Sequence, residues 1–434
     1  MSTSTSRDNF APHGGMVIVG GGECGARAAF ALRDKGWSGD VTVIGAEDLH
    51  AYERPPLSKS MMLGGKFDPV HPYSLDDFLT ARIRLLRSTR VCEIKPTEHR
   101  IILEDGSHLG YAYLLLAVGG TPRRLPLPSS KDLLYLRTYE DALAILDQLQ
   151  TDRNVCVIGA GLIGLEIAAS ARTRGCSVTV IEFADRALVR AVPPQVAAKV
   201  VELHQEKGVR FHWSTSATAV DRVDDKSLVT LSTGETLAFD AVAVGIGSVP
   251  NTDLAESAGL TVANGIAVDD RLRTSASEIF AAGDCTSFPH PIFGNTRMRL
   301  EAWRNALDQS LTAATNMLGG DESYRVIPWF WSDQYDHTLQ VSGLPSLSMK
   351  TVERIRPDGV TIYFGLDEAD RLVSASAIAP GNSVAKDIKA AQVLMSEGIH
   401  PTAAQLSDPA LPILQIRALA RRAAQPTIIN VTDA

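Results

Sequence analysis

The feature that most constrains the fold of this chain is a glycine fingerprint that occurs twice. Its two copies are Gly20-x-Gly22-x-x-Gly25 and Gly159-x-Gly161-x-x-Gly164. In this pattern the first glycine permits a tight turn, the second lets the backbone approach a pyrophosphate, and the third lets a helix pack closely on a strand. The N-terminus of that helix then presents its partial positive charge to the phosphates.

The segments around each copy give the fingerprint its meaning. An apolar run, a stretch of helical spacing and a second β-branched run follow one another at 16–19, 27–35 and 40–44, and again at 155–158, 165–174 and 177–181. Each series predicts a strand–helix–strand unit of about 30 residues. Two such units predict an α/β chain with two Rossmann-like, dinucleotide-binding domains. Two further strands, 114–118 and 241–244, each run into a glycine turn, and we assign Gly247 in the second turn to the second dinucleotide.

A carboxylate follows each fingerprint at the distance where it can accept hydrogen bonds from ribose hydroxyls. Glu47 lies 22 residues after Gly25, and Glu182 lies 18 residues after Gly164. A carboxylate at position 182 repels the 2′-phosphate of NADPH, at a cost of about 4 kcal/mol for unit charges about 4 Å apart at an effective dielectric of about 20. The second site is therefore expected to take NADH. The alternative is a solvated surface glutamate.

Composition bounds the class of protein. With 434 residues, two or three domains are expected, and 45 % hydrophobic and 21 % charged residues are typical of globular chains. No apolar run approaches the roughly 18 residues of a membrane helix, so we expect a soluble protein without a membrane partner. The net charge of −8 argues against a nucleic-acid partner. The first 15 residues lack the apolar core of a signal peptide, and a cytoplasmic location is expected.

The five cysteines do not form a recognisable framework. They are Cys24, Cys92, Cys156, Cys176 and Cys285, without a C-x-x-C pair or the spacing of a zinc site. Neither a disulfide framework nor a metal site is expected. Buried, inert packing is the interpretation for Cys24 and Cys285.

Three further segments carry a family resemblance. They are Tyr52–Lys59 (YERPPLSK), Ala281–Cys285 (AAGDC) and Pro328–Gln334 (PWFWSDQ). In this order they resemble the ferredoxin reductases of bacterial multicomponent oxygenases, which serve aromatic-ring dioxygenases (such as the cinnamate and biphenyl systems) or cytochromes P450 (the putidaredoxin and rhodocoxin reductases). The resemblance runs from about Val17 to about Gly398.

The resemblance implies a glutathione-reductase-like architecture with a C-terminal α+β domain. A change of composition near Tyr324, followed by alternating stretches at 359–364 and 371–378, also predicts a third, sheet-containing domain. The expected domains are a disordered tail (1–15), a discontinuous FAD-binding domain (16–122 and 251–324), an NAD-binding domain (123–250), the C-terminal domain (325–405) and a helix with a tail (406–434).

The resemblance also assigns roles to side chains near the flavin. Lys59 is implied to lie beside FAD N5, where an ammonium stabilises the charge that a hydride leaves on the ring, with Glu166 holding the lysine in place. Trp331 is implied to lie near the flavin toward the partner. The alternatives are a solvent-facing lysine and a core tryptophan. The FAD contacts implied are Gly20, Gly22, Cys24, Gly25, Glu47, Arg54, Lys59, Val91, Arg137, Asp284, Glu301 and Trp303; those for NAD are Gly159, Gly161, Gly164, Glu182 and Gly247.

Two positions depart from the family pattern. Ala46 stands where many relatives have an aspartate, so the ribose contact passes to Glu47. The segment Ala117-Val118-Gly119 replaces Ala-Thr-Gly and loses a hydroxyl.

The function that this set of residues favours is electron transfer from NADH through FAD to a [2Fe-2S] ferredoxin that supplies an oxygenase. No cysteine lies between Gly25 and Val91, which disfavours the disulfide-reductase and NADH-peroxidase chemistries of related proteins. Arg297, Arg299 and Arg304 are candidate contacts for an acidic ferredoxin in a monomer or homodimer. Two alternatives remain: an NADH oxidase or quinone reductase without a protein acceptor, and a non-catalytic flavoprotein that senses NADH.

Overall fold

The computed structural model describes residues 14–64, 68–127 and 133–423, so most of the predicted N-terminal tail and residues 424–434 lie outside the described residues. The chain forms two compact units. The first comprises Met1–Arg54, Asp68–Thr121 and Ser248–Arg325; the second comprises Pro55–Phe67, Pro122–Gly247 and Val326–Ala434.

A mainly parallel sheet organises the first unit. In spatial order its strands are β3 (Ile83–Leu86), β2 (Val41–Ile44), β1 (Gly15–Val19), β6 (His108–Leu116), β5 (Arg100–Leu103) and β4 (Val91–Lys95), with β18 (Ile279–Ala281) also paired to β6. The pairs β1–β2, β1–β6, β2–β3 and β6–β18 are parallel, whereas β5 pairs antiparallel with β4 and β6. Residues 16–18 are at most 1 % exposed, as expected of a strand covered on both faces.

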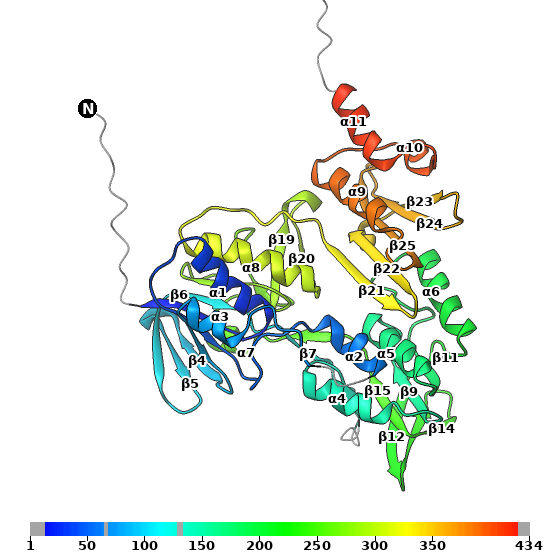
Figure 1. Ribbon diagram of the computed structural model, residues 1–434, viewed down its shortest axis with the longest axis horizontal. Helices are drawn as coiled ribbons and strands as arrows, with labels where there is room; N and C mark the ends of the chain where they lie inside the picture. The colour runs from blue at the N-terminus through cyan, green and yellow to red at the C-terminus, as the bar shows by residue number, and fades with distance from the viewer. Residues whose placement is uncertain (1–13, 65–67, 128–132, 424–434) are drawn as a thin grey trace, which may run out of the picture. The chain divides into compact units, whose positions relative to one another are not determined.

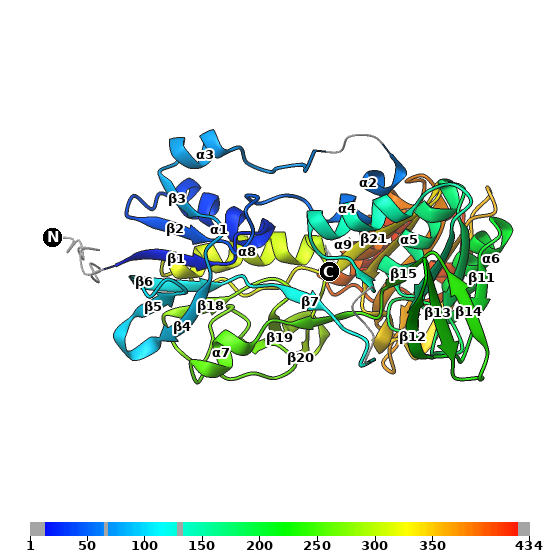
Figure 2. The ribbon, with the colours of Figure 1, turned by 90° about the horizontal axis from the view of Figure 1, so that it is seen from below.

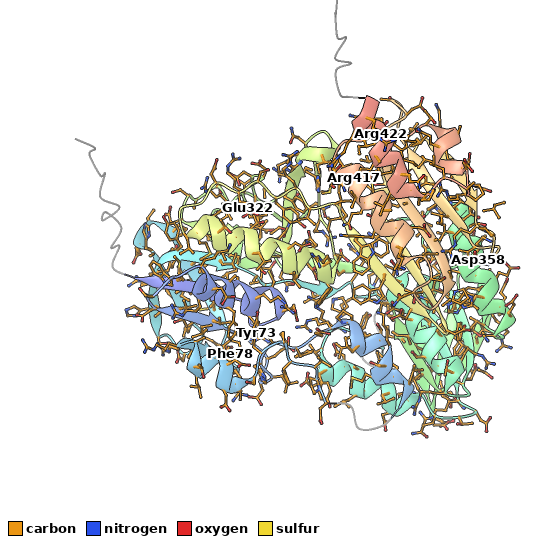
Figure 3. All side chains as sticks on the ribbon, turned by 45° about the horizontal axis from the view of Figure 1, so that its top comes forward. Tyr73, Phe78, Glu322, Asp358, Arg417 and Arg422 are labelled. Atoms are coloured by element: carbon orange, nitrogen blue, oxygen red, sulfur yellow. The ribbon has the colours of Figure 1, made fainter. Side chains whose placement is uncertain are left out.

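Two helices of the first unit lie side by side, as Figure 1 shows: α1 (Glu23–Asp34) and α8 (Trp303–Met317). Smaller elements complete the unit: α3 (Leu75–Thr80), η2 (Pro96–Glu98), β7 (Gly120–Pro122) paired with β16 (Ser248–Pro250), α7 (Asp253–Ser257), η4 (Pro291–Phe293) and the sheet β17 (Ile266–Ala267), β19 (Thr286–His290) and β20 (Thr296–Met298). Tyr73 and Phe78, labelled in Figure 3, pack on Phe30 of α1, with ring centroids 3.6 and 5.0 Å away.

The second unit contains the second parallel sheet. Its strands, in spatial order, are β11 (Arg210–His212), β10 (Ser177–Ile181), β9 (Asn154–Ile158), β15 (Ala241–Val244) and β8 (Leu134–Tyr135). Its helices are α4 (Tyr139–Gln148), α5 (Leu162–Thr173) and α6 (Pro194–Glu206), and the segment Pro55–Leu63 adds η1 (Pro55–Ser58) and α2 (Ser60–Leu63). Beside it lies an antiparallel sheet (Figure 2) of β12 (Ala217–Val223), β13 (Lys226–Leu231) and β14 (Thr236–Phe239).

The C-terminal part of the second unit is a five-stranded antiparallel sheet with helices. In spatial order the strands are β21 (Trp329–Gln334), β22 (His337–Gly343), β25 (Leu372–Pro380), β24 (Thr361–Leu366) and β23 (Lys350–Ile355), followed in the chain by α9 (Ala385–Ser396), α10 (Ala403–Ser407) and α11 (Ile413–Ala423); η5 (Pro345–Leu347) precedes β23. Arg417, labelled in Figure 3, forms an ion pair with Glu397 just beyond α9 and so ties α11 to that helix.

Most elements predicted from the pattern are confirmed, and the α/β class with them. The alternating stretch at 371–378 forms the expected strand, β25, but residues 372–379 are buried without interruption. The reason is tertiary: β25 contacts both α9 and α6, so neither set of side chains along it faces water. Within the described residues no helix is long and apolar enough to span a bilayer, and no cluster of three potential metal ligands is found.

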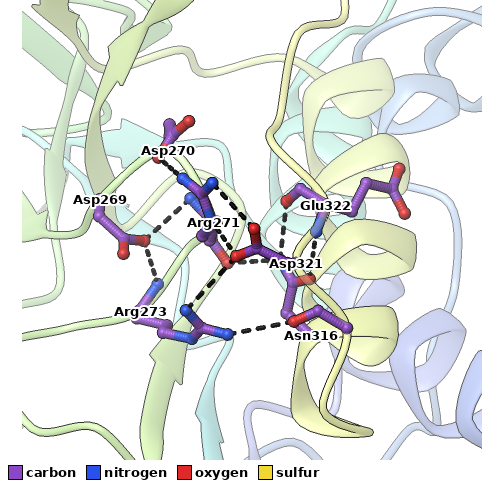
Figure 4. Close-up of polar contacts among 8 residues, drawn as sticks. Asp269, Asp270, Arg271, Arg273, Asn316, Asp321 and Glu322 are labelled. Carbon is purple, nitrogen blue, oxygen red and sulfur yellow. Dashed lines mark hydrogen bonds and ion pairs between the residues drawn. The ribbon is translucent and has the colours of Figure 1, made fainter.

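A cluster of polar contacts fixes the end of α8 to the loop that contains Arg271 (Figure 4). Arg271 forms ion pairs with Asp270 and Asp321. The amide nitrogen of Asn316, a side chain 2 % exposed, donates to the carbonyls of Arg271 and Glu322 at 2.8 Å, and its oxygen accepts from the Glu322 backbone N–H at 2.8 Å. One buried amide thus satisfies three backbone groups.

Replacing Asn316 with alanine is therefore expected to lower the free energy of unfolding by about 2–4 kcal/mol, since buried backbone groups lose their partners. Urea titration of the variant measures this loss. Leu311→Ala, on the same helix but 43 % exposed, is the control and should change stability by less than about 1 kcal/mol. Equal effects of the two substitutions would contradict the role given to Asn316.

Candidate functional site

The first glycine loop has the backbone of a phosphate-binding turn. Gly20 adopts φ +122°, and a Cβ there would lie 2.1 Å from the carbonyl oxygen of Ala117. A Cβ at Gly25 would lie 1.9 Å from the carbonyl oxygen of Gly20, so the helix α1 can pack this closely only on a glycine. Gly22 precedes α1 in an extended conformation, and a Cβ there would meet nothing within 4 Å. The open side of the loop is the side that a pyrophosphate would approach.

The second loop repeats this geometry. Gly159 has φ +104°, and a Cβ at Gly164 would lie 2.1 Å from the carbonyl oxygen of Gly159. Gly161 precedes α5, and the nearest atom to a Cβ there, the Gly245 carbonyl oxygen, would be 3.5 Å away. Both loops therefore fit a dinucleotide pyrophosphate at a helix N-terminus.

Glu182 directly follows β10 and Glu47 lies in the loop after β2, but each already has partners. Glu47 accepts hydrogen bonds from the Tyr52 hydroxyl and the Arg54 guanidinium, both at 2.6 Å. Glu182 accepts from the backbone N–H groups of Ala160, inside the glycine loop, at 2.6 Å and of Ala184 at 2.8 Å. Because a carboxylate has about four acceptor positions, ribose hydroxyls can still be bound. Glu182 also fixes the loop itself, a contact that spacing did not indicate.

The other residues assigned to the cofactors are spread over both units. Val91 opens β4, Asp284 follows β18, and Glu301 and Trp303 lie at the start of α8, which begins at Trp303 as the sequence suggested. These four belong to the first unit, with Gly20–Gly25. Arg137 belongs to the second unit, where it precedes α4, and its assignment to FAD stays a prediction. Gly247 has φ +99°, which favours glycine.

The cysteines near the first loop are buried. Cys24 is 7 % and Cys285 is 0 % exposed. Burial raises the pKa of Cys24 well above its ordinary value and that of Cys285 to about 11. All five cysteines are free thiols in this structure. A thiol held protonated is a poor nucleophile, so the geometry gives Cys24 and Cys285 packing roles.

A largely buried ion pair lies in the second unit. Lys59, between η1 and α2, lies with its Nζ 2.8 Å from Oε2 of Glu166, which α5 supplies. The side chains are 16 % and 4 % exposed. The ammonium also lies 5.8 Å from the ring centroid of Trp331, and Trp331 stacks on Trp329. The three residues predicted as catalytic are thus neighbours, and the solvent-facing alternative for Lys59 is wrong.

Two further side chains bind Glu166 that the sequence did not single out. The Ser58 hydroxyl donates to Oε2, and the Ser332 hydroxyl donates to Oε1 at 2.5 Å. Ser332 in turn accepts from Gln334 at 2.9 Å, and Gln334 binds His204 at 2.8 Å. Two-residue spacing in β21 could have indicated that Ser332 and Gln334 share one face. His204 lies 130 residues away from Gln334 in the chain and carried no such signal.

The three arginines predicted to contact a ferredoxin are engaged within the first unit. Arg297 donates to the carbonyls of Val268 and Ser287, Arg299 pairs with Glu301 and has a side chain 9 % exposed, and Arg304 pairs with Asp308 at 2.8 Å and has a side chain 47 % exposed. Burial makes Arg299 a poor surface contact. Arg304 remains a candidate.

Comparison with known proteins shows which family has this arrangement of residues. The chain matches the pyridine nucleotide-disulphide oxidoreductase family over residues 15–310 and the reductase C-terminal family over residues 329–417. The ferredoxin–NAD(+) reductase component of the anthranilate 1,2-dioxygenase system of Burkholderia cepacia is 40 % identical over 400 residues, 91 % of this chain and 97 % of that relative. Putidaredoxin reductase of Pseudomonas putida is 36 % identical over 375 residues, 84 % of this chain and 88 % of that relative.

A solved structure agrees with these relatives. The crystal structure of a covalent putidaredoxin reductase–putidaredoxin complex superposes with a TM-score of 0.89 at 33 % identity and covers 95 % of this chain and 100 % of that chain. The resemblance that three sequence motifs indicated is therefore confirmed over almost the whole chain.

Replacement by alanine should have different effects at Gly22 and at Gly25 of the first loop. Gly22→Ala should leave the stability of the apoprotein nearly unchanged, because its Cβ meets no protein atom, but should weaken FAD binding about tenfold or more by blocking the phosphate approach. Gly25→Ala should instead destabilise the protein by about 2 kcal/mol or more. Flavin titration and thermal unfolding measure the two quantities. Normal FAD affinity in Gly22→Ala would contradict the assignment.

His204 should make stability depend on pH. It is 0 % exposed, and burial lowers its pKa from 6.5 to about 4. Between these values the unfolded chain binds a proton that the folded chain does not, so stability falls as pH drops from 6.5 to 4, by about 3 kcal/mol from this residue. In His204→Gln the loss of stability between pH 6.5 and pH 4 should be smaller by this contribution of His204. The free energy of unfolding, measured at both pH values for both proteins, gives the two losses. Parallel curves for the two proteins would show that His204 is not buried as a neutral group.

Proposed function

We propose that this chain, which belongs to the pyridine nucleotide-disulphide oxidoreductase family, is an FAD-containing, NADH-dependent ferredoxin reductase. The observation that carries the proposal is the likeness, along nearly the full length, to ferredoxin–NAD(+) reductase components of oxygenase systems. Electrons would pass from NADH through FAD to a [2Fe-2S] ferredoxin that supplies an aromatic-ring dioxygenase or a cytochrome P450. NADH is a cytoplasmic metabolite, and we place the reaction in the cytoplasm.

The two glycine loops support the binding of two dinucleotides. In this proposal residues 20–25 bind the FAD pyrophosphate and residues 159–164 bind that of NADH. Bound FAD accepts a hydride as an electron pair and can release electrons singly, which is the chemistry of the cofactor. The protein contributes positions and charges rather than an acid or a base.

Lys59 is the charged group best suited to assist the reduction of FAD. Its ammonium is largely withdrawn from water, and a charge in such surroundings acts more strongly than one at the surface. Glu166 keeps the lysine in one place, and Trp331 limits its movement from the side of β21. In this role Lys59 stabilises negative charge, and no proton transfer is required of it.

Glu182 supports NADH over NADPH. Its carboxylate is fixed by two backbone N–H groups and cannot easily turn away from a 2′-phosphate. Repulsion of about 1.4 kcal/mol is already tenfold in affinity. The same two hydrogen bonds leave lone pairs that can accept from the two hydroxyls of NADH.

The cysteines support direct transfer from the flavin to an external acceptor. Buried thiols with raised pKa values, such as Cys24 and Cys285, are not fit to relay electrons as a thiolate would. The electrons must then leave without a protein disulfide. A small iron–sulfur protein is the acceptor that the relatives' names indicate.

One experiment separates this function from its alternatives. The holoprotein is reduced anaerobically with NADH or NADPH, and cytochrome c reduction is then followed with and without a [2Fe-2S] ferredoxin. We expect NADH to act at least about tenfold more efficiently than NADPH, and cytochrome c turnover to depend on the ferredoxin. Equal turnover with oxygen or a quinone alone would identify an oxidase or quinone reductase. Slow flavin reduction with a long-lived charge-transfer complex would indicate an NADH sensor.

A further inference from the structure

Glu166 is one end of a buried chain of hydrogen bonds in the second unit. From Glu166 the chain passes to Ser332 (2.5 Å), to Gln334 (2.9 Å), to His204 (2.8 Å) and to Tyr335 (3.3 Å). Ser332, Gln334 and His204 are each 0 % exposed. These hydrogen bonds connect α5 and α6 with β21, which lies far from both helices in the sequence.

The donors of this chain all point toward Glu166. Ser332 donates its hydroxyl proton to the carboxylate, and its oxygen accepts from the amide nitrogen of Gln334. The Gln334 carbonyl oxygen then faces Nε2 of His204, which must carry the proton. Nδ1 of the neutral ring is left to accept from the Tyr335 hydroxyl. Each link thus determines the direction of the next.

Burial makes this direction hard to reverse. If the Gln334 amide turned over, its nitrogen would donate to Nε2 of His204, whose proton would have to move to Nδ1, and Ser332 would donate to Gln334 instead of Glu166. The carboxylate would lose one of its three donors. A buried polar group that loses its partner is destabilising, and a charged one is more so. The arrangement is therefore stable only as a whole.

We propose that His204, Gln334 and Ser332 are positioning residues that act on the Lys59 ammonium through Glu166. This inference rests on the proposed function, in which Lys59 assists the reduction of FAD. Donors on Oε1 compensate part of the carboxylate charge. The carboxylate then takes less of its compensation from Lys59, and more of the ammonium's positive potential remains for the flavin.

Substitutions along the chain should have effects that fade with distance from Glu166. Ser332→Ala removes the donor itself and should slow flavin reduction by NADH about tenfold, as the loss of a hydrogen bond to a charged group allows. Gln334→Met leaves the serine in place but unsupported and should slow it about threefold. The flavin midpoint potential should become more negative in the same order, by about 30 mV per tenfold loss in equilibrium constant for a two-electron couple. The dissociation constant of NADH should not change.

The double variant distinguishes a connected chain from separate structural contacts. If Gln334 acts only through Ser332, the variant with both substitutions should be no slower than Ser332→Ala alone. Multiplied effects, or an unchanged potential in Ser332→Ala, would overturn the proposal. Ser332→Thr, which keeps a hydroxyl, should restore most of the rate and the potential.

Ser376→Ala is the matched control. Ser376 is 1 % exposed in β25 of the same sheet, and its hydroxyl has no hydrogen-bond partner among the described residues. Its replacement should leave rate and potential unchanged. A loss as large as that of Ser332→Ala would show that any buried cavity in this sheet disturbs the flavin, and would overturn the proposal.

Two measurements keep the proposal independent of the proposed function. The midpoint potential is measured by dithionite titration, without NADH. If NADH does not reduce the wild-type protein, the proposed function is refuted, but the titration still tests the hydrogen-bond chain. Nitrogen NMR of His204 in the holoprotein should show the neutral ring protonated at Nε2. A proton at Nδ1 would reverse the direction of the chain and overturn the inference.

Discussion

The structure of the second unit depends on the burial of one carboxylate. Glu166 is 4 % exposed, and an ion withdrawn from water in this way requires donors on both oxygens. The three donors come from two segments: the one before α2 supplies Ser58 and Lys59, and β21 supplies Ser332. The helix that follows the second glycine loop is thereby joined to the C-terminal sheet. Without that sheet Oε1 would lose its donor.

The buried pair also explains why the lysine is not simply at the surface. A lysine in water would be mobile and screened, and its charge would act weakly at a distance. Held at 2.8 Å from Glu166 and 5.8 Å from the Trp331 ring centroid, the Lys59 ammonium has little freedom. In the proposed hydride transfer, such a fixed charge is more useful than a group that gains and loses protons.

Sequence reasoning succeeded where the physical requirement is local. Each glycine loop is a six-residue pattern whose backbone conformation only glycine can supply, so Gly20 and Gly159 were identifiable without a structure. Most strand boundaries followed because buried parallel strands are short apolar runs, although the strand expected at 114–118 spans His108–Leu116. Prediction from the sequence failed where segments distant in the chain decide which residues are buried. Residues 372–379 alternate in the sequence but are covered on both faces, and His204 reads as one more polar residue on an amphipathic helix.

The same distinction explains which parts of the site were found. Lys59 and Glu166 were reached through a family resemblance, and the structure supplies the reason for their proximity, namely the contact of α2 and η1 with α5. Ser332 and Gln334 lie within the motif that carried the resemblance, yet nothing in that motif shows that their side chains face Glu166 rather than Trp329. The role proposed for them rests on the hydrogen bonds that join Glu166 through Ser332 and Gln334 to His204, which only the fold brings together. A motif records which residues occur together, whereas the direction of a hydrogen bond is a property of the fold.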